Sequence, residues 1–111
     1  MTEEYLSAEE QIQANYMSSD MFMLSFWCDA NAMNTDEDER VIAWRRDQDA
    51  TMSLSKSLET AETKQDIMDA LEAIRSTTLN YRTRSAIEDC VDQYFPEFAM
   101  PGAADDFVPG L

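Results

Sequence analysis

Apolar residues recur at helical spacing over most of the first 95 positions, and the pattern divides into four segments. We expect helices near residues 8–33, 36–60, 64–80 and 86–95. A hydroxyl residue precedes each segment, with an acidic residue three positions later, which is the capping-box pattern of a helix start. These hydroxyl residues are Ser7, Thr35, Thr63 and Ser85.

The few glycines and prolines lie almost entirely at the end of the chain. There are 2 Gly and 3 Pro, and only Pro96 comes before residue 100. Since hairpins need glycine at their turns, the sequence favours helices. The predicted fold class is all-α, a compact bundle of about four helices. We expect a bundle domain over residues 1–95 and an irregular tail over residues 96–111.

Two breaks in the pattern suggest interruptions. The apolar positions of residues 67–81 and of residues 87–94 are out of phase, so one straight helix could not bury both sets. We therefore predict a turn around residues 80–84. Residues 51–57 are rich in Ser and Thr, which are poor helix formers, and predict a kink or a loop.

The first predicted helix carries two apolar stripes on roughly opposite sides. One stripe consists of Ile12, Tyr16, Met23, Phe26, Trp27 and Ala30, and the other of Ala14, Met17, Met21, Leu24 and Cys28. A helix that is apolar on both sides lies at the centre of a fold or is shared between two copies. For a chain of this length we expect a homodimer through this helix.

Acidic residues dominate the charge and gather in two parts of the chain. There are 23 acidic and 8 basic residues, for a net charge of −15, and residues 1–39 and 85–111 contain no base. In an up-down bundle the first and last helices are neighbours, so the two base-free segments would form one acidic face. The predicted partner-binding residues of this face are Glu9, Glu10, Asp20, Asp36, Glu37, Asp38, Glu39, Glu88, Asp89 and Asp92. A chain of this charge should bind neither nucleic acid nor an anionic membrane directly.

Most catalytic and metal chemistry is excluded. The chain has no His, which rules out His-based triads and His-ligated metals. An EF-hand loop begun at Asp29 fails because Arg40 stands where a bidentate Glu is needed. Cys28 and Cys90 read as core residues, and the sequence leaves open whether they ever pair. We expect no enzyme activity, no cofactor and no metal site, and, since the acidic start is unlike a signal peptide, a cytoplasmic location.

Two functions remain. The first is an acidic inhibitor that acts as a decoy by occupying the basic nucleic-acid-binding surface of a partner protein. In charge and size alone, the chain resembles virus-encoded DNA mimics and inhibitors of bacterial defence systems. The second is a small dimeric adaptor, chaperone or assembly subunit that binds through a Met-rich and aromatic surface or through the tail. The residues of this alternative are Met17, Met21, Leu24, Phe107, Val108 and Leu111.

Overall fold

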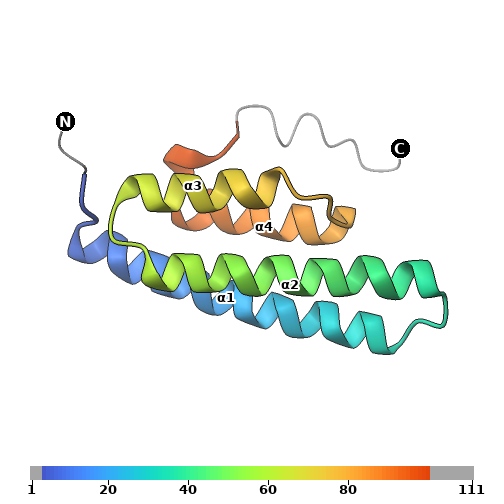
Figure 1. Cartoon of the computed structure of the whole chain (residues 1–111). Coiled ribbons are helices and arrows are strands. Elements are labelled where there is room, and N and C mark those ends of the chain that lie inside the picture. Colours follow the sequence, from blue (N-terminus) through green and yellow to red (C-terminus); the bar gives the residue numbers. More distant parts are fainter. Residues whose placement is uncertain (1–3, 101–111) are drawn as a thin grey trace.

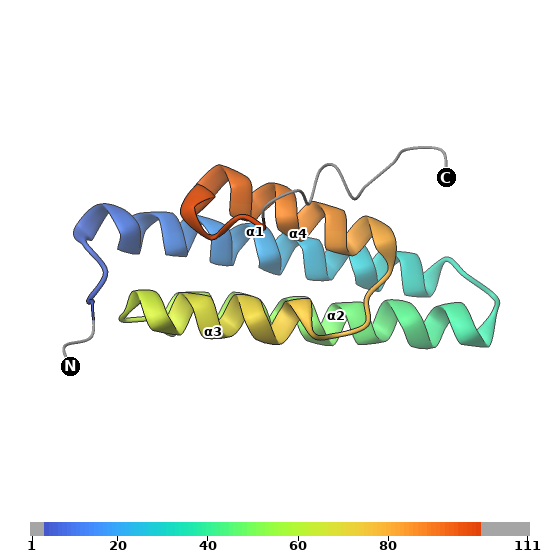
Figure 2. The ribbon, with the colours of Figure 1, turned by 90° about the horizontal axis from the view of Figure 1, so that it is seen from above.

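The described part of the chain forms four α-helices, as the sequence predicts. The computed structural model describes residues 4–100. The helices are α1 (Ala8–Met33), α2 (Asp38–Thr60), α3 (Lys64–Arg75) and α4 (Tyr81–Tyr94), followed by a short 3₁₀ helix, η1 (Pro96–Phe98). The long helices α1 and α2 form an antiparallel pair, and the shorter α3 and α4 lie against it (Figures 1 and 2). The all-α class is therefore confirmed.

The capping boxes at the starts of α1 and α3 are confirmed. The Ser7 hydroxyl accepts a hydrogen bond from the Glu10 amide (3.1 Å), and the Glu10 carboxylate accepts one from the Ser7 amide (2.9 Å). Thr63 and Asp66 form the same reciprocal pair at α3, with both distances 3.1 Å. These bonds satisfy amides that have no partner within the helix, which fixes both starts where the sequence predicts them.

The predicted kink at residues 51–57 is wrong, because α2 is continuous from Asp38 to Thr60. Ser18 of α1 and Ser55 of α2 meet in the core, and each hydroxyl donates to the other residue's carbonyl at 2.7 Å. Small side chains let the two helices approach closely, and the reciprocal bonds satisfy both buried hydroxyls. The serines that make this stretch a poor helix former thus join it to α1.

The boundaries around the last two helices also differ from the prediction. Helix α3 ends at Arg75, and α4 begins at Tyr81, so the turn lies at residues 76–80 and Ser85 is inside a helix. The N-cap of α4 is Asn80, whose own side chain makes no capping bond. Instead, the fully buried carboxylate of Asp47 accepts from the Asn80 amide (3.2 Å). The cap of α4 therefore comes from α2.

The start of α2 also differs from the predicted start. Its N-cap is Glu37 rather than Thr35, with no side-chain capping bond, so the predicted capping box at Thr35 is wrong.

One apolar core lies between the four helices. Its residues are Ala14, Met17, Met21, Leu54, Leu58, Ala61, Ile67, Leu71, Ile74, Ile87, Val91 and Phe95. Phe98 of η1 stacks on Phe95, with ring centroids 6.0 Å apart, so the chain just after α4 still packs on the bundle. In the described part of the chain, no helix is long and apolar enough to cross a membrane.

Candidate interaction surfaces

Helices α1 and α4 are neighbours, as the predicted acidic face requires. They run antiparallel, and the Tyr94 hydroxyl of α4 donates to the Asp20 carboxylate of α1 at 2.6 Å. However, α4 begins early enough to include Arg82 and Arg84, so it is not free of bases. The outward side of α1 is mainly apolar and uncharged. The two helices therefore do not make one continuous acidic face.

Four of the ten predicted acidic residues have partners inside the protein. Glu10 caps α1 and lies 3.4 Å from the Lys64 ammonium, and these two interactions lower the pKa of its carboxyl. Asp20 accepts from Tyr94, and the Arg75 guanidinium binds Glu88 through two hydrogen bonds of 2.8 and 2.9 Å. Glu37 pairs with Arg40 at 2.9 Å.

The other six predicted residues are exposed and form no ion pair among residues 4–100. They are Glu9, Asp36, Asp38, Glu39, Asp89 and Asp92. They lie at one end of α1, at the α1–α2 turn and on α4, so the fold spreads them over separate places.

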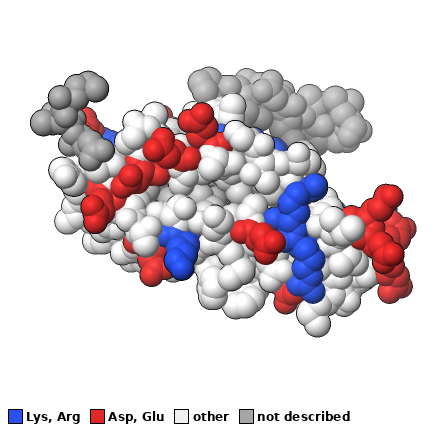
Figure 3. Space-filling model, viewed as in Figure 1, with Lys and Arg blue, Asp and Glu red and all other residues white. Residues whose placement is uncertain are grey.

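The structure brings together a different set of acids, which we call the α3 acidic row. The row consists of Glu62, Asp66, Asp69 and Glu72, all exposed and none in an ion pair within the described chain. Figure 3 shows acidic side chains in a diagonal row along this part of the molecule. Spacings of three and four residues place side chains on one side of a helix. That spacing is visible in the sequence and could have revealed the row.

Lys64, the first residue of α3, is paired with acids outside this row. The Lys64 ammonium lies 3.0 Å from a Glu4 oxygen and 3.4 Å from a Glu10 oxygen. Their carboxylates raise the pKa of the Lys64 ammonium, first through the hydrogen bond to Glu4. Within the row, Asp66 is held by the backbone amides of Glu62 and Thr63, which lower the pKa of its carboxyl. These two amides therefore favour the charged form of Asp66.

The residues predicted to bind a partner in the adaptor hypothesis do not form one exposed surface among the described residues. Met17 and Met21 are 0 % and 1 % exposed, so they are core residues and cannot hold a partner on the intact fold. Leu24 is partly buried against the same core. The remaining members, Phe107, Val108 and Leu111, lie outside the described residues.

It is the opposite stripe of α1 that faces outward. Ile12, Tyr16 and Met23 are 52 %, 60 % and 64 % exposed, and Phe26 and Trp27 are 52 % and 37 % exposed. The sequence shows both stripes but not which of them is buried. The core takes the stripe with the smaller residues Ala14 and Cys28, because α2 and α4 pack closely there.

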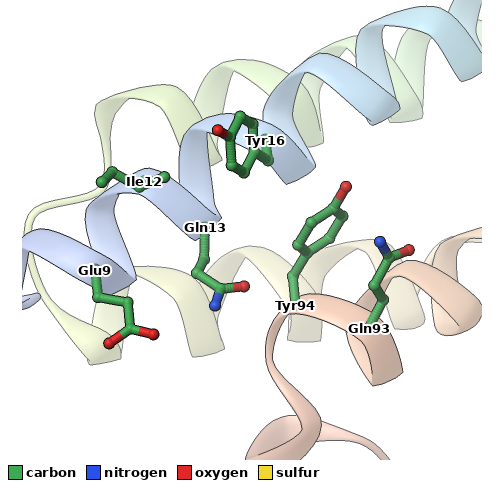
Figure 4. A pocket seen from close by; sticks show the side chains of 6 residues that line it. All are labelled: Glu9, Ile12, Gln13, Tyr16, Gln93 and Tyr94. Carbon is green, nitrogen blue, oxygen red and sulfur yellow. The ribbon is translucent and has the colours of Figure 1, made fainter.

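An open groove of about 650 Å³ adjoins the N-terminal part of this outward stripe. Its lining residues are Glu9, Ile12, Gln13 and Tyr16 of α1 and Gln93 and Tyr94 of α4. In Figure 4, Gln13 and Tyr94 point into the space between the two helices. The hydrogen bond to Asp20 raises the pKa of the Tyr94 hydroxyl to about 12, so this hydroxyl is neutral at physiological pH. The groove thus offers two tyrosine rings and two side-chain amides, beside Ile12 and the Glu9 carboxylate.

A buried polar cluster joins α1, α2 and α4. Asp47 accepts from the Thr83 hydroxyl at 2.6 Å, and the Cys28 thiol lies 3.8 Å from the same hydroxyl. Burial raises the pKa of the Cys28 thiol to about 11, and that of the Cys90 thiol likewise. Both cysteines are free. All three residues of the cluster are fully buried, so we assign it a structural role.

Residues 4–100 contain no group of three or more Cys, Asp or Glu side chains placed to hold a metal ion. Comparisons of the chain with protein-family models, curated proteins and solved structures returned no match.

Proposed function

We propose that this protein is a non-enzymatic decoy that binds the basic, nucleic-acid-binding surface of a partner protein through the α3 acidic row. The observation that carries the proposal is the row itself: four exposed carboxylates on one side of the molecule, with no basic partner among the described residues. Proteins that bind nucleic acid offer tracks of Lys and Arg, and a matching protein anion competes for them.

The spacing of the row suits such a track. From Asp66 to Glu72 the helical part of the row is roughly 9 Å long at 1.5 Å per residue, which gives about one charge per 4.5 Å, and Glu62 lies two residues before α3 begins. One strand of a duplex carries one phosphate per about 3.4 Å of axis. The row is thus somewhat sparser than one DNA strand. The net charge of −15 adds a long-range field that would speed the encounter with a basic surface.

The six predicted acids that are exposed and form no ion pair contribute in a different way. Asp36, Asp38 and Glu39 lie together at the α1–α2 turn, at one end of the long helix pair. We assign these residues to the general field rather than to direct contact, because the turn is separated from α3 by much of the length of α2. In this proposal the protein works in the cytoplasm, and a viral origin with a bacterial defence protein as partner fits its size and charge.

Affinity capture with two matched variants tests the proposal. The row variant carries Glu62→Gln, Asp69→Asn and Glu72→Gln, and spares Asp66 because Asp66 caps α3. The control variant carries Asp36→Asn, Asp38→Asn and Glu39→Gln, and so loses the same number of charges at the α1–α2 turn.

Each immobilised protein is exposed to an extract of the native host cell at about 0.1 M salt, where exposed charges are only partly screened. Wild type and the control variant should retain a nucleic-acid-binding protein that duplex DNA displaces, and the row variant should retain at least about tenfold less. Equal retention by the row variant, or a retained protein that DNA does not displace, contradicts the proposal.

The adaptor function keeps one favourable observation, which is the outward apolar stripe of α1. The occupant that we propose for that stripe is a second copy of this chain, as argued from its spacing and area.

A further inference from the structure

The outward side of α1 has the residue spacing of a coiled-coil seam. Seven exposed positions alternate by four and three residues, and none is charged. They are Ile12, Tyr16, Ser19, Met23, Phe26, Ala30 and Met33, which we call the α1 seam. A repeat of this kind keeps one line of side chains facing a partner helix over several turns. The seam spans about 32 Å at 1.5 Å per residue.

The fold keeps charge away from the seam. Between Ile12 and Met33 the chain has two acids, Asp20 and Asp29, and each is held by a neighbouring helix. The Tyr94 hydroxyl of α4 donates to Asp20, and the Arg45 guanidinium of α2 binds Asp29. The surface between them is left apolar, which suits a partner surface that is itself uncharged.

The large side chains beside the seam are held by ring contacts. The rings of Phe22 and Phe26 meet edge to face with centroids 4.7 Å apart, and those of Trp27 and Trp44 with centroids 5.1 Å apart. Side chains ordered before association lose less conformational entropy when a partner binds. These aromatic residues are therefore suited to act as contact points.

The exposed area matches what a stable dimer needs. Ile12, Tyr16, Phe22, Met23, Phe26 and Trp27 are between 37 % and 64 % exposed. From the usual areas of such side chains, they present roughly 700 Å² of mainly apolar surface, against about 800 Å² per partner in a standard interface. A monomer rarely leaves a contiguous apolar patch of this size uncovered.

We infer that the α1 seam is covered by the α1 seam of a second copy of this chain, in an antiparallel, two-fold symmetric pair. An uncharged seam is self-complementary, so the same patch serves both copies. A parallel pair would set the two Asp36–Glu39 clusters beside each other, whereas an antiparallel pair holds them about a helix length apart, roughly 39 Å, which is several Debye lengths.

Side-chain size also favours the antiparallel pair. In a parallel pair Ser19 would face Ser19 and Ala30 would face Ala30, which leaves those two layers underfilled. In an antiparallel pair each small residue faces a large one from the other copy, and the layers fill evenly. The partner helix would also cover the rim of the groove beside Ile12 and Tyr16.

Sedimentation of the full chain tests the dimer, with a pair of matched variants. Met23→Glu places a charge at the centre of the seam, and Met68→Glu places the same charge on α3, at a methionine that is 46 % exposed. Both substitutions are on the surface, so circular dichroism should show the native helix content in both. Wild type and Met68→Glu should dimerise at protein concentrations between about 1 and 100 μM. Met23→Glu should raise the dissociation constant of the dimer at least about 100-fold, because each dimer would bury two unpaired charges.

The orientation has its own measurement. Ala30→Cys, in a Cys90→Ser background, would cross-link to itself readily in a parallel pair, and the two thiols would lie roughly 20 Å or more apart in an antiparallel pair. Efficient self-cross-linking at this position therefore overturns the antiparallel arrangement. A wild-type chain that stays monomeric up to about 100 μM, or a dimer that Met23→Glu leaves intact, overturns the dimer itself. In those cases something other than a second copy of this chain covers the seam.

Salt separates this dimer from the proposed decoy function. Two copies, each with a net charge of −15, repel each other, so raising the salt from about 0.1 to 0.5 M should strengthen the dimer. The same change should weaken binding of the α3 acidic row to a basic partner. Either proposal can therefore fail while the other stands.

Discussion

Removing the Asp47 carboxylate should destabilise the protein more than any other single charge change considered above. Asp47 is fully buried, and its carboxylate accepts from the Asn80 amide, from the Asn80 side-chain amide (3.0 Å) and from the Thr83 hydroxyl (2.6 Å). It thus holds the turn before α4 and the first turn of α4 against α2.

The magnitude follows from these three donors. A hydrogen bond to a charged group contributes about 1.5–3 kcal/mol, and a buried group left without a partner costs about 1–3 kcal/mol. In an Asp47→Ala variant the Asn80 donors can reach water, while the Thr83 hydroxyl, which is fully buried, cannot. We expect a loss of about 3–5 kcal/mol, which is a large share of the total stability of a small domain.

The assay is urea unfolding followed by circular dichroism, with Asp49→Ala as the control. Asp49 lies on the same helix but is exposed, so its removal should change the free energy of unfolding by less than about 0.5 kcal/mol. Amide exchange should also rise in the first turn of α4, where the Arg84 amide donates to the Asn80 carbonyl, and stay unchanged in the middle of α1. A loss below about 1 kcal/mol for Asp47→Ala would show that the carboxylate does not cap α4.

Two further predictions concern contacts between helices. Tyr94→Phe removes the hydrogen bond to Asp20, which raises the pKa of Tyr94 to about 12. Because the ordinary pKa of tyrosine is about 10, the bond contributes fully to the stability of the fold below about pH 10. That contribution is lost as the pH rises to 12. The stability difference between wild type and Tyr94→Phe, measured by urea unfolding, should therefore shrink from pH 10 to 12, and a constant difference would contradict the assignment. Arg75→Gln breaks the two bonds to Glu88 and the bond to the carbonyl of residue 98, and should cost about 2 kcal/mol in the same assay. The exposed pair of Arg40 with Glu37 is the control, and Arg40→Gln should cost less than about 0.5 kcal/mol.

Local sequence signals predicted the helices whose ends are capped locally. Ser7 and Thr63 lie within three residues of the carboxylates that complete their boxes, and both helix starts are where the sequence places them. Ser85 has the same local pattern, yet α4 begins before it because Asp47, 33 residues earlier than Asn80, supplies the cap. A cap that comes from another helix has no signature in the neighbouring sequence.

For the candidate surfaces too, the sequence predicted local features but not those that depend on how the helices pack. Charge counts predicted an acidic protein but placed the acids on α1 and α4, since a count ignores which side of a helix each residue occupies. Periodicity found both stripes of α1, but it could not choose between them. The choice depends on Ser18 and Ser55, whose reciprocal bonds bring the side of α1 with the small residues against α2.

The placement of aromatic residues on α1 supports the dimer that we propose. A chain that folds only with itself gains most by burying its largest apolar side chains. Here Phe95 is the one fully buried aromatic residue among residues 4–100, whereas the four aromatic residues of α1 are all exposed. The buried side of the same helix is filled by Ala, Ser, Cys and Met. Burying the aromatic side of α1 against a second copy would recover this unused hydrophobic stabilisation, and it would leave the α3 acidic row, which lies on another helix, open to a basic partner.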